Sequence, residues 1–335
     1  MTRIARRGAA ARTVAEVGEM SILDRLRRRS HRASGVEIGI GDDCAVVRLR
    51  GRRLVLTTDT LVEGVHFRSG WDTFAGLGDR AFQVNASDVA AMGADVRFAL
   101  LSLSVPRSAR VRDLEDLIRG FERAARRAGC VLVGGNLTAA PQWVVGVTVI
   151  GEAVAVPLTR SGARPGDGLW VSGTIGGAAR ARELLLAGKK AAPRETRAFR
   201  RPTARLSLGR ALARRRLASA AIDLSDGLIQ DLGHLCRASR VGAVVEADGL
   251  PLPAPLRRLP RDERLRLALG GGEDYELLFT APARAERSLK DLGTPVRKIG
   301  RIERGRGVRV IAADGRELPL DAIGFDHFSR GARLR

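Results

Sequence analysis

The sequence predicts a two-domain α/β protein in which helices and strands alternate along the whole chain. Its 335 residues exceed what one hydrophobic core usually serves, so we expect two domains with a cleft between them. Hydrophobic residues make up 44% of the chain, which suffices for ordinary globular cores. No apolar run approaches the roughly 18 residues that a membrane span requires, so we expect no membrane partner.

The first domain is expected to span residues 19–150, after a basic extension at 1–18 that lacks the apolar stretch of a secretory signal. Helical periodicity begins near Met20, and a glycine-rich turn follows it. Alternating and helical apolar spacing then predicts strands at 45–49, 54–58, 98–105, 131–133 and 143–150, and helices at 74–92 and 111–128.

The second domain is expected to span residues 151–330, because glycines and prolines gather between 151 and 168. The alternation then resumes, with strands predicted at 169–172, 221–224, 243–246 and 275–280, and helices at 177–187, 204–215, 227–239 and 282–292. A hairpin is expected to turn at Asp314-Gly315. The proline-rich stretch 250–260 is interpreted as a connector.

The chain is strongly basic, with 58 Lys+Arg against 37 Asp+Glu and a formal net charge of +21. Such a balance normally suggests a nucleic-acid partner. Here nearly all of the basic residues are arginines scattered along the chain, and aromatic residues make up only 4%. Because no basic surface with interleaved aromatic residues is evident, we interpret the charge as a compositional bias and expect no nucleic acid.

The three cysteines, Cys44, Cys130 and Cys236, lie far apart and follow no metal-ligand spacing. They predict neither a disulfide framework nor a zinc site, and they suit a reducing cytoplasm. Cys44 is interpreted as a small packing residue.

Aspartates gather beside glycines and small residues in four clusters, which are 39–45, 56–60, 85–93 and 222–227. A single cluster of this kind is more often a helix cap or a turn. Four together favour a site for a hard cation such as Mg²⁺, which takes oxygen ligands from several loops and from substrate phosphates. Glycine pairs at 134–135, 176–177 and 270–272 add backbone that can donate to phosphate oxygens. Since no P-loop or protein-kinase motif is present, metals are expected to replace the usual lysine.

Six segments carry a resemblance to a known family. They read GIGDDCA, TTDTLVEGVHF, SDVAAMGA, LTRSGARPGD, IDLSDGLIQDLGHL and GGEDYELLF, and a terminal GFDHF follows them. In this order they resemble the thiamine-monophosphate kinases, which share a superfamily with aminoimidazole ribonucleotide synthetase, selenophosphate synthetase and a hydrogenase maturation factor. The resemblance covers roughly residues 20–328.

The resemblance implies an α/β fold like that of aminoimidazole ribonucleotide synthetase, with a homodimer formed through the N-terminal sheets. It implies transfer of the γ-phosphoryl group of ATP to thiamine monophosphate with several Mg²⁺ ions, the last step of thiamine diphosphate biosynthesis. The family's metal ligands match Asp43, Thr57, Thr58, Asp59, Asp88, Asn136, Asp223 and Asp226. Its nucleotide contacts match Gly135, Asn136, Arg160 and Ser225, and its thiamine contacts match His66, Glu273 and Phe325.

Asn136 departs from the family, which usually carries aspartate there. Asparagine keeps one carbonyl oxygen but loses the negative charge, so we expect weaker metal binding at this position. Asp42, beside Asp43, is interpreted as a residue that fixes the turn at least as readily as a ligand.

Two alternatives to the kinase remain. One is a superfamily paralogue that acts on another acceptor; the chain lacks the C-terminal cysteine of the maturation factor, and no lysine precedes Lys189 as the selenium enzyme would require. The other is a catalytically silent nucleotide-binding protein, which Asn136 and the +21 charge would suit.

Overall fold

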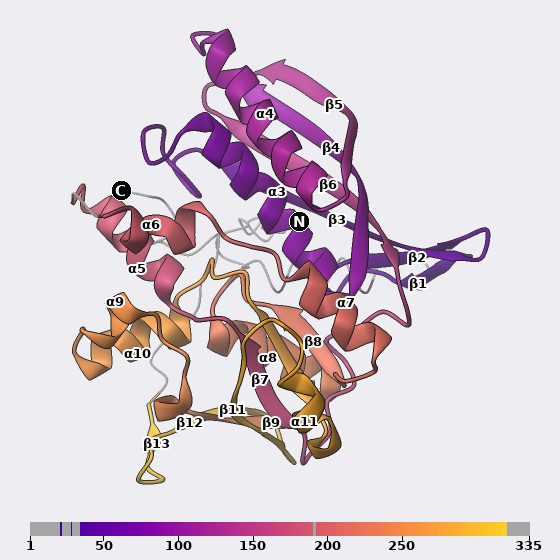
Figure 1. The fold of residues 1–335 in the computed structure, drawn as a ribbon, viewed down its shortest axis with the longest axis vertical. Helices are drawn as coiled ribbons and strands as arrows, with labels where there is room; N and C mark the ends of the chain where they lie inside the picture. The colour runs from indigo at the N-terminus through magenta and orange to yellow at the C-terminus, as the bar shows by residue number, and fades with distance from the viewer. Residues whose placement is uncertain (1–20, 22–27, 29–33, 190–191, 320–335) are drawn as a thin grey trace, which may run out of the picture.

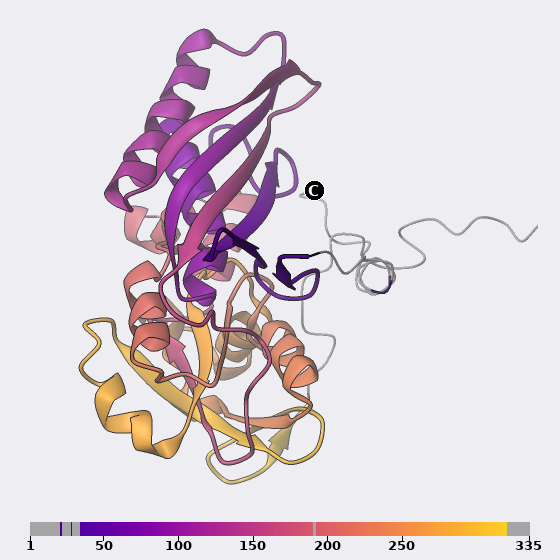
Figure 2. The ribbon, with the colours of Figure 1, turned by 90° about the vertical axis from the view of Figure 1, so that its right-hand side faces the viewer.

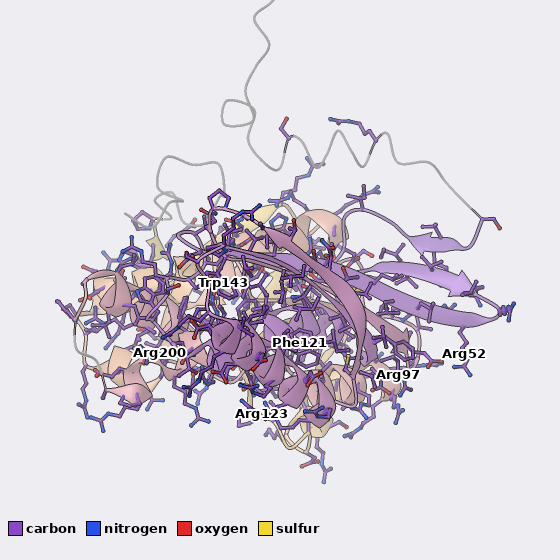
Figure 3. All side chains as sticks on the ribbon, turned by 90° about the horizontal axis from the view of Figure 1, so that it is seen from above. Arg52, Arg97, Phe121, Arg123, Trp143 and Arg200 are labelled. Atoms are coloured by element: carbon purple, nitrogen blue, oxygen red, sulfur yellow. The ribbon has the colours of Figure 1, made fainter. Side chains whose placement is uncertain are left out.

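The computed structural model describes residues 21, 28, 34–189 and 192–319, which form two α/β units stacked one above the other (Figure 1). The helix expected near Met20 and the basic segment 1–18 fall outside this range. Of the described helices, none combines the length and the apolar character that crossing a bilayer demands. Arg52 and Arg97 lie on the outside of the molecule (Figure 3).

The N-terminal unit is a six-stranded sheet with two helices on one face (Figure 2). The strand order is β1-β2-β3-β6-β4-β5; β4 and β5 run parallel, and the other neighbours run antiparallel. Its elements are β1 Val36–Ile38, β2 Ala45–Leu49, β3 Arg52–Val62, α3 Phe74–Ala91, β4 Ala94–Val105, α4 Val111–Arg127, β5 Val131–Ala139 and β6 Val144–Ala153.

Helices α3 and α4 pack closely against each other because glycines face the partner backbone. A Cβ atom at Gly78 would lie 2.0 Å from the Leu117 carbonyl oxygen, and one at Gly120 would lie 1.9 Å from that of Ala75. The rings of Phe82 and Phe121 meet edge to face at 5.6 Å in the core below. This close packing fixes α3, which carries Asp88, against the sheet.

The C-terminal unit is built on a seven-stranded sheet with the order β13-β12-β9-β11-β7-β10-β8. Its strands are β7 Gly168–Ser172, β8 Ala220–Asp223, β9 Gly242–Glu246, β10 Leu277–Ala281, β11 Val296–Glu303, β12 Gly307–Ile311 and β13 Glu317–Leu318. Its helices are α5 Gly177–Leu186, α6 Pro193–Arg200, α7 Leu206–Arg214, α8 Leu228–Ser239, α9 Ala254–Arg257, α10 Arg261–Gly270 and α11 Glu286–Leu289, with 3-10 turns at Ala247–Gly249 and Ala283–Ala285.

Helix α7 joins the two units. It lies beside α3 in Figure 1, and its Leu208 and Leu212 share a buried cluster with Ala90 of α3 and Phe279 of β10. A Cβ atom at Gly209 would lie 1.9 Å from the Ala90 carbonyl oxygen, so the two helices touch through their backbones. The cleft between the units is therefore held at a fixed width near this helix.

Most predicted elements are confirmed, and strand 45–49 matches β2 to the residue. The helix predicted at 282–292 is wrong, because a 3-10 turn and the single turn of α11 take its place. The predicted connector 250–260 contains the short helix α9. Its prolines lie at the start of this helix, where proline is well tolerated. Helices α6 and α10 and strand β11 are additions that the sequence patterns do not predict.

Candidate active site

A cavity of about 860 Å³ lies where the two units meet. The N-terminal unit contributes the end of β3, the loop after it and α3; the C-terminal unit contributes α5, α10 and the loops before α8 and β10. Of the site residues predicted from the sequence, the cavity brings together Asp43, Thr57, Thr58, Asp59, His66, Asp88, Arg160, Asp223, Ser225, Asp226 and Glu273.

Three carboxylates from distant parts of the chain meet at one end of the cavity. Asp43 precedes β2, Asp88 lies on α3 and Asp223 ends β8, and one oxygen of each lies within 4.8 Å of the others. Thr57 donates its hydroxyl proton to Asp88 at 2.6 Å, and Arg160 pairs with Asp43 at 2.5 Å. We name these three aspartates the carboxylate cluster.

The carboxylate cluster fits a hard divalent cation. Among the described residues, the Oδ2 atoms of Asp43 and Asp223 are buried and accept no hydrogen bond. Buried polar atoms without partners are costly, and their position beside a shared space calls for a ligand. The donors are all oxygens, which Mg²⁺ prefers and which Zn²⁺ sites rarely rely on alone.

Burial and mutual repulsion disfavour the charged forms of these groups. Burial, followed by the nearby charges of Asp59 and Asp223, raises the pKa of Asp88 well above its usual range. Burial and then Asp43 raise the pKa of Asp223 to about 8. Like charges held together in this way are a common signature of a metal or catalytic site.

The free energy of unfolding of the metal-free protein is expected to fall between about pH 6.5 and 8. The native pKa values of Asp223 (about 8) and Asp274 (about 7) lie above that of an unfolded aspartate, so the native state binds more protons and loses stability as pH rises. Below about pH 6.5 the half-buried His234, whose pKa is lowered to about 4 chiefly by loss of solvent, acts in the opposite direction.

Urea unfolding at about pH 6.5, 7.2 and 8.0, with EDTA or with Mg²⁺, measures this dependence. Mg²⁺ binds the deprotonated carboxylates, so its stabilising effect is expected to grow across the same interval. If the free energy of unfolding in EDTA rises with pH instead, the carboxylates of the cluster are already charged at about pH 6.5 and neighbouring groups balance their charge.

Three further predicted ligands, Asp59, Thr58 and Asp226, also line the cavity. Asp59 follows Thr57 by two residues on β3, so both side chains lie on the face that α3 covers. Thr58 lies on the opposite face, where its hydroxyl donates to the Val147 carbonyl at 2.9 Å and accepts from Thr148. Asp226 lies before α8 and accepts from the Gln230 side chain at 3.2 Å.

His66 and Glu273 also line the cavity. The Nδ1 atom of His66 accepts the Val62 backbone N–H at 3.0 Å, so the neutral ring carries its proton on Nε2. Glu273 belongs to the glycine-rich loop before β10 and adopts a left-handed backbone, with φ of 73°. Phe325, the third predicted thiamine contact, falls outside the described residues.

Gly135 and Asn136 are not part of the cavity lining; they are exposed on the edge strand β5. The strand register places Asn136 beside Ser102, Ser102 beside Gly146, and Gly146 beside Thr60. These residues share the sheet face that α3 and α4 leave uncovered. Since Thr60 also lines the cavity, a polar row connects the cavity rim with Asn136 across that face.

Two acidic residues of the motifs have structural roles. As interpreted from the sequence, Asp42 fixes the turn: it accepts the backbone N–H groups of Asp43 and Arg160, each at 3.1 Å. Asp274 accepts from the backbone of Gly176 and Ala178, and so caps the N-terminus of α5.

Sequence reasoning missed several cavity residues, including Arg182 and Arg266 on helices and Tyr275 beside Glu273. The two arginines carry no signal in a chain with so many of them. Tyr275 could have been noticed, because it is the single tyrosine of the sequence. Arg80, buried on α3, also escaped notice.

Comparison with known proteins finds two family models in this chain. Residues 41–153 match the AIR synthase related protein, N-terminal domain, and residues 164–313 match the AIR synthase related protein, C-terminal domain. Hydrogenase maturation protein HypE in complex with ATP has the same fold, with a TM-score of 0.70 at 21% identity over 84% of this chain and 89% of that one.

Closer relatives share one description. Thiamine-monophosphate kinase of Escherichia coli K12 is 39% identical over 93% of this chain and 98% of its own length, and that of Aquifex aeolicus is 36% identical over 93% and 99%. The solved structure of AaThiL complexed with AMPPCP and TMP superimposes with a TM-score of 0.84 at 34% identity, covering 95% of this chain and all of that one. The chain therefore belongs to the thiamine-monophosphate kinase family, within the AIR synthase related proteins.

Proposed function

We propose that this protein transfers the γ-phosphoryl group of ATP to thiamine monophosphate and releases thiamine diphosphate and ADP, in the cytoplasm. One observation carries the proposal: the carboxylate cluster opens into a cavity of about 860 Å³, in a chain that superimposes along 95% of its length on a relative complexed with AMPPCP and TMP. A volume of this size is in the range of small-molecule binding sites.

Asp43, Asp88 and Asp223 would hold Mg²⁺, with Asp59 and Asp226 beside them and Thr57 as a further oxygen. Bound Mg²⁺ would supply positive charge that offsets the repulsion between the triphosphate of ATP and the phosphate of the acceptor. The need is large, because two unit charges 4 Å apart repel by roughly 4 kcal/mol at an effective dielectric of 20. The spread of carboxylates over several loops and elements favours several ions.

The acceptor requires little activation from the protein. A phosphate monoester has its second pKa near 6, so at neutral pH it is already an anionic nucleophile. The protein's task is then to align acceptor and donor in line and to exclude water, which suits direct transfer without a phosphoenzyme. Arg160 is held by Asp43 here; it and Ser225, on the cavity wall, would contact the nucleotide phosphates.

Two other residues of the cavity wall, Glu273 and His66, suit the thiamine moiety. Glu273 offers a carboxylate to a cationic thiazolium or to an aminopyrimidine amine, and His66 offers an N–H donor on Nε2. The carboxylate cluster would thus face the phosphates and their metals, and Glu273 and His66 would offer hydrogen-bonding groups to the rings.

A homodimer through the uncovered face of the N-terminal sheet would complete the site. On β4 and β5 this surface exposes Phe98, Leu100, Val131 and Val133, with exposed fractions of 39–56%. We name these four residues the apolar sheet face. Contiguous exposed apolar groups of this kind mark association surfaces, and a second copy of the same face is self-complementary. The polar row to Asn136 runs along the same face, so Gly135 and Asn136 would meet nucleotide at the subunit boundary.

Asn136→Asp is expected to lower the Mg²⁺ concentration that gives half-maximal activity, because it adds a negative charge at the end of the polar row. The measurement is an Mg²⁺ titration of turnover at saturating ATP. The matched control, Thr138→Asp, places the same charge two residues further along β5. If the two variants and the wild type share one titration curve, Asn136 is not at a metal.

The direct test incubates purified protein with ATP, Mg²⁺ and thiamine monophosphate and resolves thiamine diphosphate by chromatography, with unphosphorylated thiamine as the control acceptor. Product from the monophosphate alone is the expected result. Mg²⁺-dependent ATP binding without product would favour the silent nucleotide-binding protein, and product from a different phosphorylated acceptor would favour the paralogue.

A further inference from the structure

Arg80 is the one arginine among the buried polar residues of the described part of the chain, and its side chain is 3% exposed. It lies on α3, two turns before Asp88. A guanidinium cannot lose its proton to escape burial, so its charge must be compensated by what it touches. Its contacts therefore reveal what this position of α3 is used for.

Three separate segments converge on this guanidinium. Nη1 donates to the backbone carbonyl of His66 at 3.0 Å, and Nη2 forms an ion pair with Oε2 of Glu273. The central carbon of the group lies 4.0 Å from the centre of the Phe199 ring on α6. Arg80 thus joins the N-terminal unit to two parts of the C-terminal unit, and two of its partners, His66 and Glu273, line the cavity.

The backbone of Glu273 is already held from the other side. Its N–H donates to the Ser225 carbonyl at 2.7 Å, and its neighbour Gly272 fits only without a side chain, because a Cβ atom there would lie 2.3 Å from the same oxygen. The left-handed conformation of Glu273 is unfavourable for a residue with a side chain and persists where surrounding contacts require it. The ion pair with Arg80 then holds one carboxylate oxygen, Oε2, while the charge of Arg182 also acts on this carboxylate.

His66 is fixed in a similar way. Its Nδ1 atom accepts from Val62 and its carbonyl accepts from Arg80, so both the ring and the backbone are oriented by neighbours. Loss of the Arg80 contact would release the carbonyl and leave the ring on a loop with one anchor fewer.

We propose that Arg80 is a positioning residue that sets Glu273 and His66 for the ring end of the acceptor and ties them to the helix that carries Asp88. The inference rests on the proposed function, whose acceptor it concerns. Oε2 of Glu273 is used by Arg80, and Oε1 is the oxygen that the acceptor meets. Arg80 does not itself touch the reacting phosphates.

The test compares Arg80→Met, Arg80→Lys and Arg201→Met in steady-state kinetics. Arg201 pairs with Asp72 between the end of α6 and the segment before α3, so it bridges the same elements without reaching the cavity. We expect Arg80→Met to raise KM for thiamine monophosphate roughly tenfold or more, as the loss of a charged hydrogen bond implies, with KM for ATP nearly unchanged. Arg80→Lys should recover part of the loss, and Arg201→Met should match the wild type.

A second variant separates positioning from folding. Arg80→Met leaves Glu273 as a carboxylate without its buried partner, so Arg80→Met with Glu273→Gln should recover thermal stability while KM for the acceptor stays high. Wild-type KM values in folded Arg80→Met, or equal changes in KM for both substrates, would overturn the proposal.

Hydrogen exchange keeps the test independent of the reaction. Arg80→Met should speed exchange of the Glu273 amide and of the loop 63–69, and unchanged exchange would also overturn the proposal. If the wild-type protein makes no thiamine diphosphate, the proposed function is refuted. The hydrogen-exchange result would then still test whether Arg80 orders Glu273 and the loop 63–69.

Discussion

Asp88→Asn is expected to abolish turnover and, at the same time, to stabilise the metal-free protein. Loss of one metal-holding carboxylate should lower kcat by roughly 10³-fold or more, in line with the removal of a preorganised charge from an active site. The stability effect has the opposite sign because Asp88 lies half-buried beside Asp43, Asp59 and Asp223, and the loss of solvent and these charges raise its pKa. Removing this charge relieves the desolvation and the repulsion, so the free energy of unfolding should increase at about pH 8.

Asparagine is the suitable replacement because it keeps the local hydrogen bond. Thr57 donates to Oδ2 of Asp88, and the amide oxygen of asparagine can accept the same proton. The experiment pairs turnover with thermal melts in EDTA and in Mg²⁺: the variant should melt higher in EDTA and gain little from Mg²⁺. Asp59→Asn should share the loss of turnover.

Asp95→Asn is the matched control. Asp95 is an aspartate of the same unit that pairs with Arg97 and Arg210, away from the cavity. Its replacement should leave turnover intact and lower stability slightly, since a partly exposed ion pair contributes at most about 1 kcal/mol. Near wild-type turnover in Asp88→Asn would refute the metal site, and lower stability in EDTA would show that Asp88 serves the fold instead.

The sequence predicts well the two long helices of the N-terminal unit. Helices α3 and α4 are predicted nearly to the residue, because their apolar positions repeat with helical spacing and a glycine follows each of them closely. Helix α10 was missed because it buries Leu265, Leu267, Ala268 and Leu269 almost consecutively, which no single helical face would do. Strand β11 was missed because charged residues interrupt its pattern around Ile299 and Ile302.

The site residues also divide into those that the sequence predicts and those that it does not. Aspartates beside glycines were informative because both residue types are needed where backbone and ligand approach closely, and the cavity gathers Asp43, Asp88 and Asp223 from three distant segments. Arg80 gave no signal, since its role arises from three tertiary contacts that no local pattern encodes. The sequence also does not predict that Asn136 lies away from the cavity, because that position depends on the strand order β3-β6-β4-β5.

Val133→Arg is expected to convert the proposed homodimer into monomers of 36.0 kDa. Activity is expected to fall as the dimer dissociates. Val133 lies on β5 in the apolar sheet face with an exposed fraction of 56%, so the monomer should accept arginine without loss of stability. In a symmetric dimer each subunit brings the new charge to the same apolar surface. Burying both without partners should weaken association by at least roughly 10³-fold.

Val111→Arg controls for the added charge. Val111 is 69% exposed at the start of α4, in the helix layer on the other side of the sheet, so this variant should remain dimeric and active. Light scattering with size exclusion gives the mass, and turnover at rising protein concentration shows whether activity returns with the dimer. Since the polar row from Thr60 to Asn136 crosses the same surface, a monomer should chiefly lose affinity for ATP. A monomeric wild type would refute the dimer, and a monomeric Val133→Arg with full activity would confine the site to one subunit.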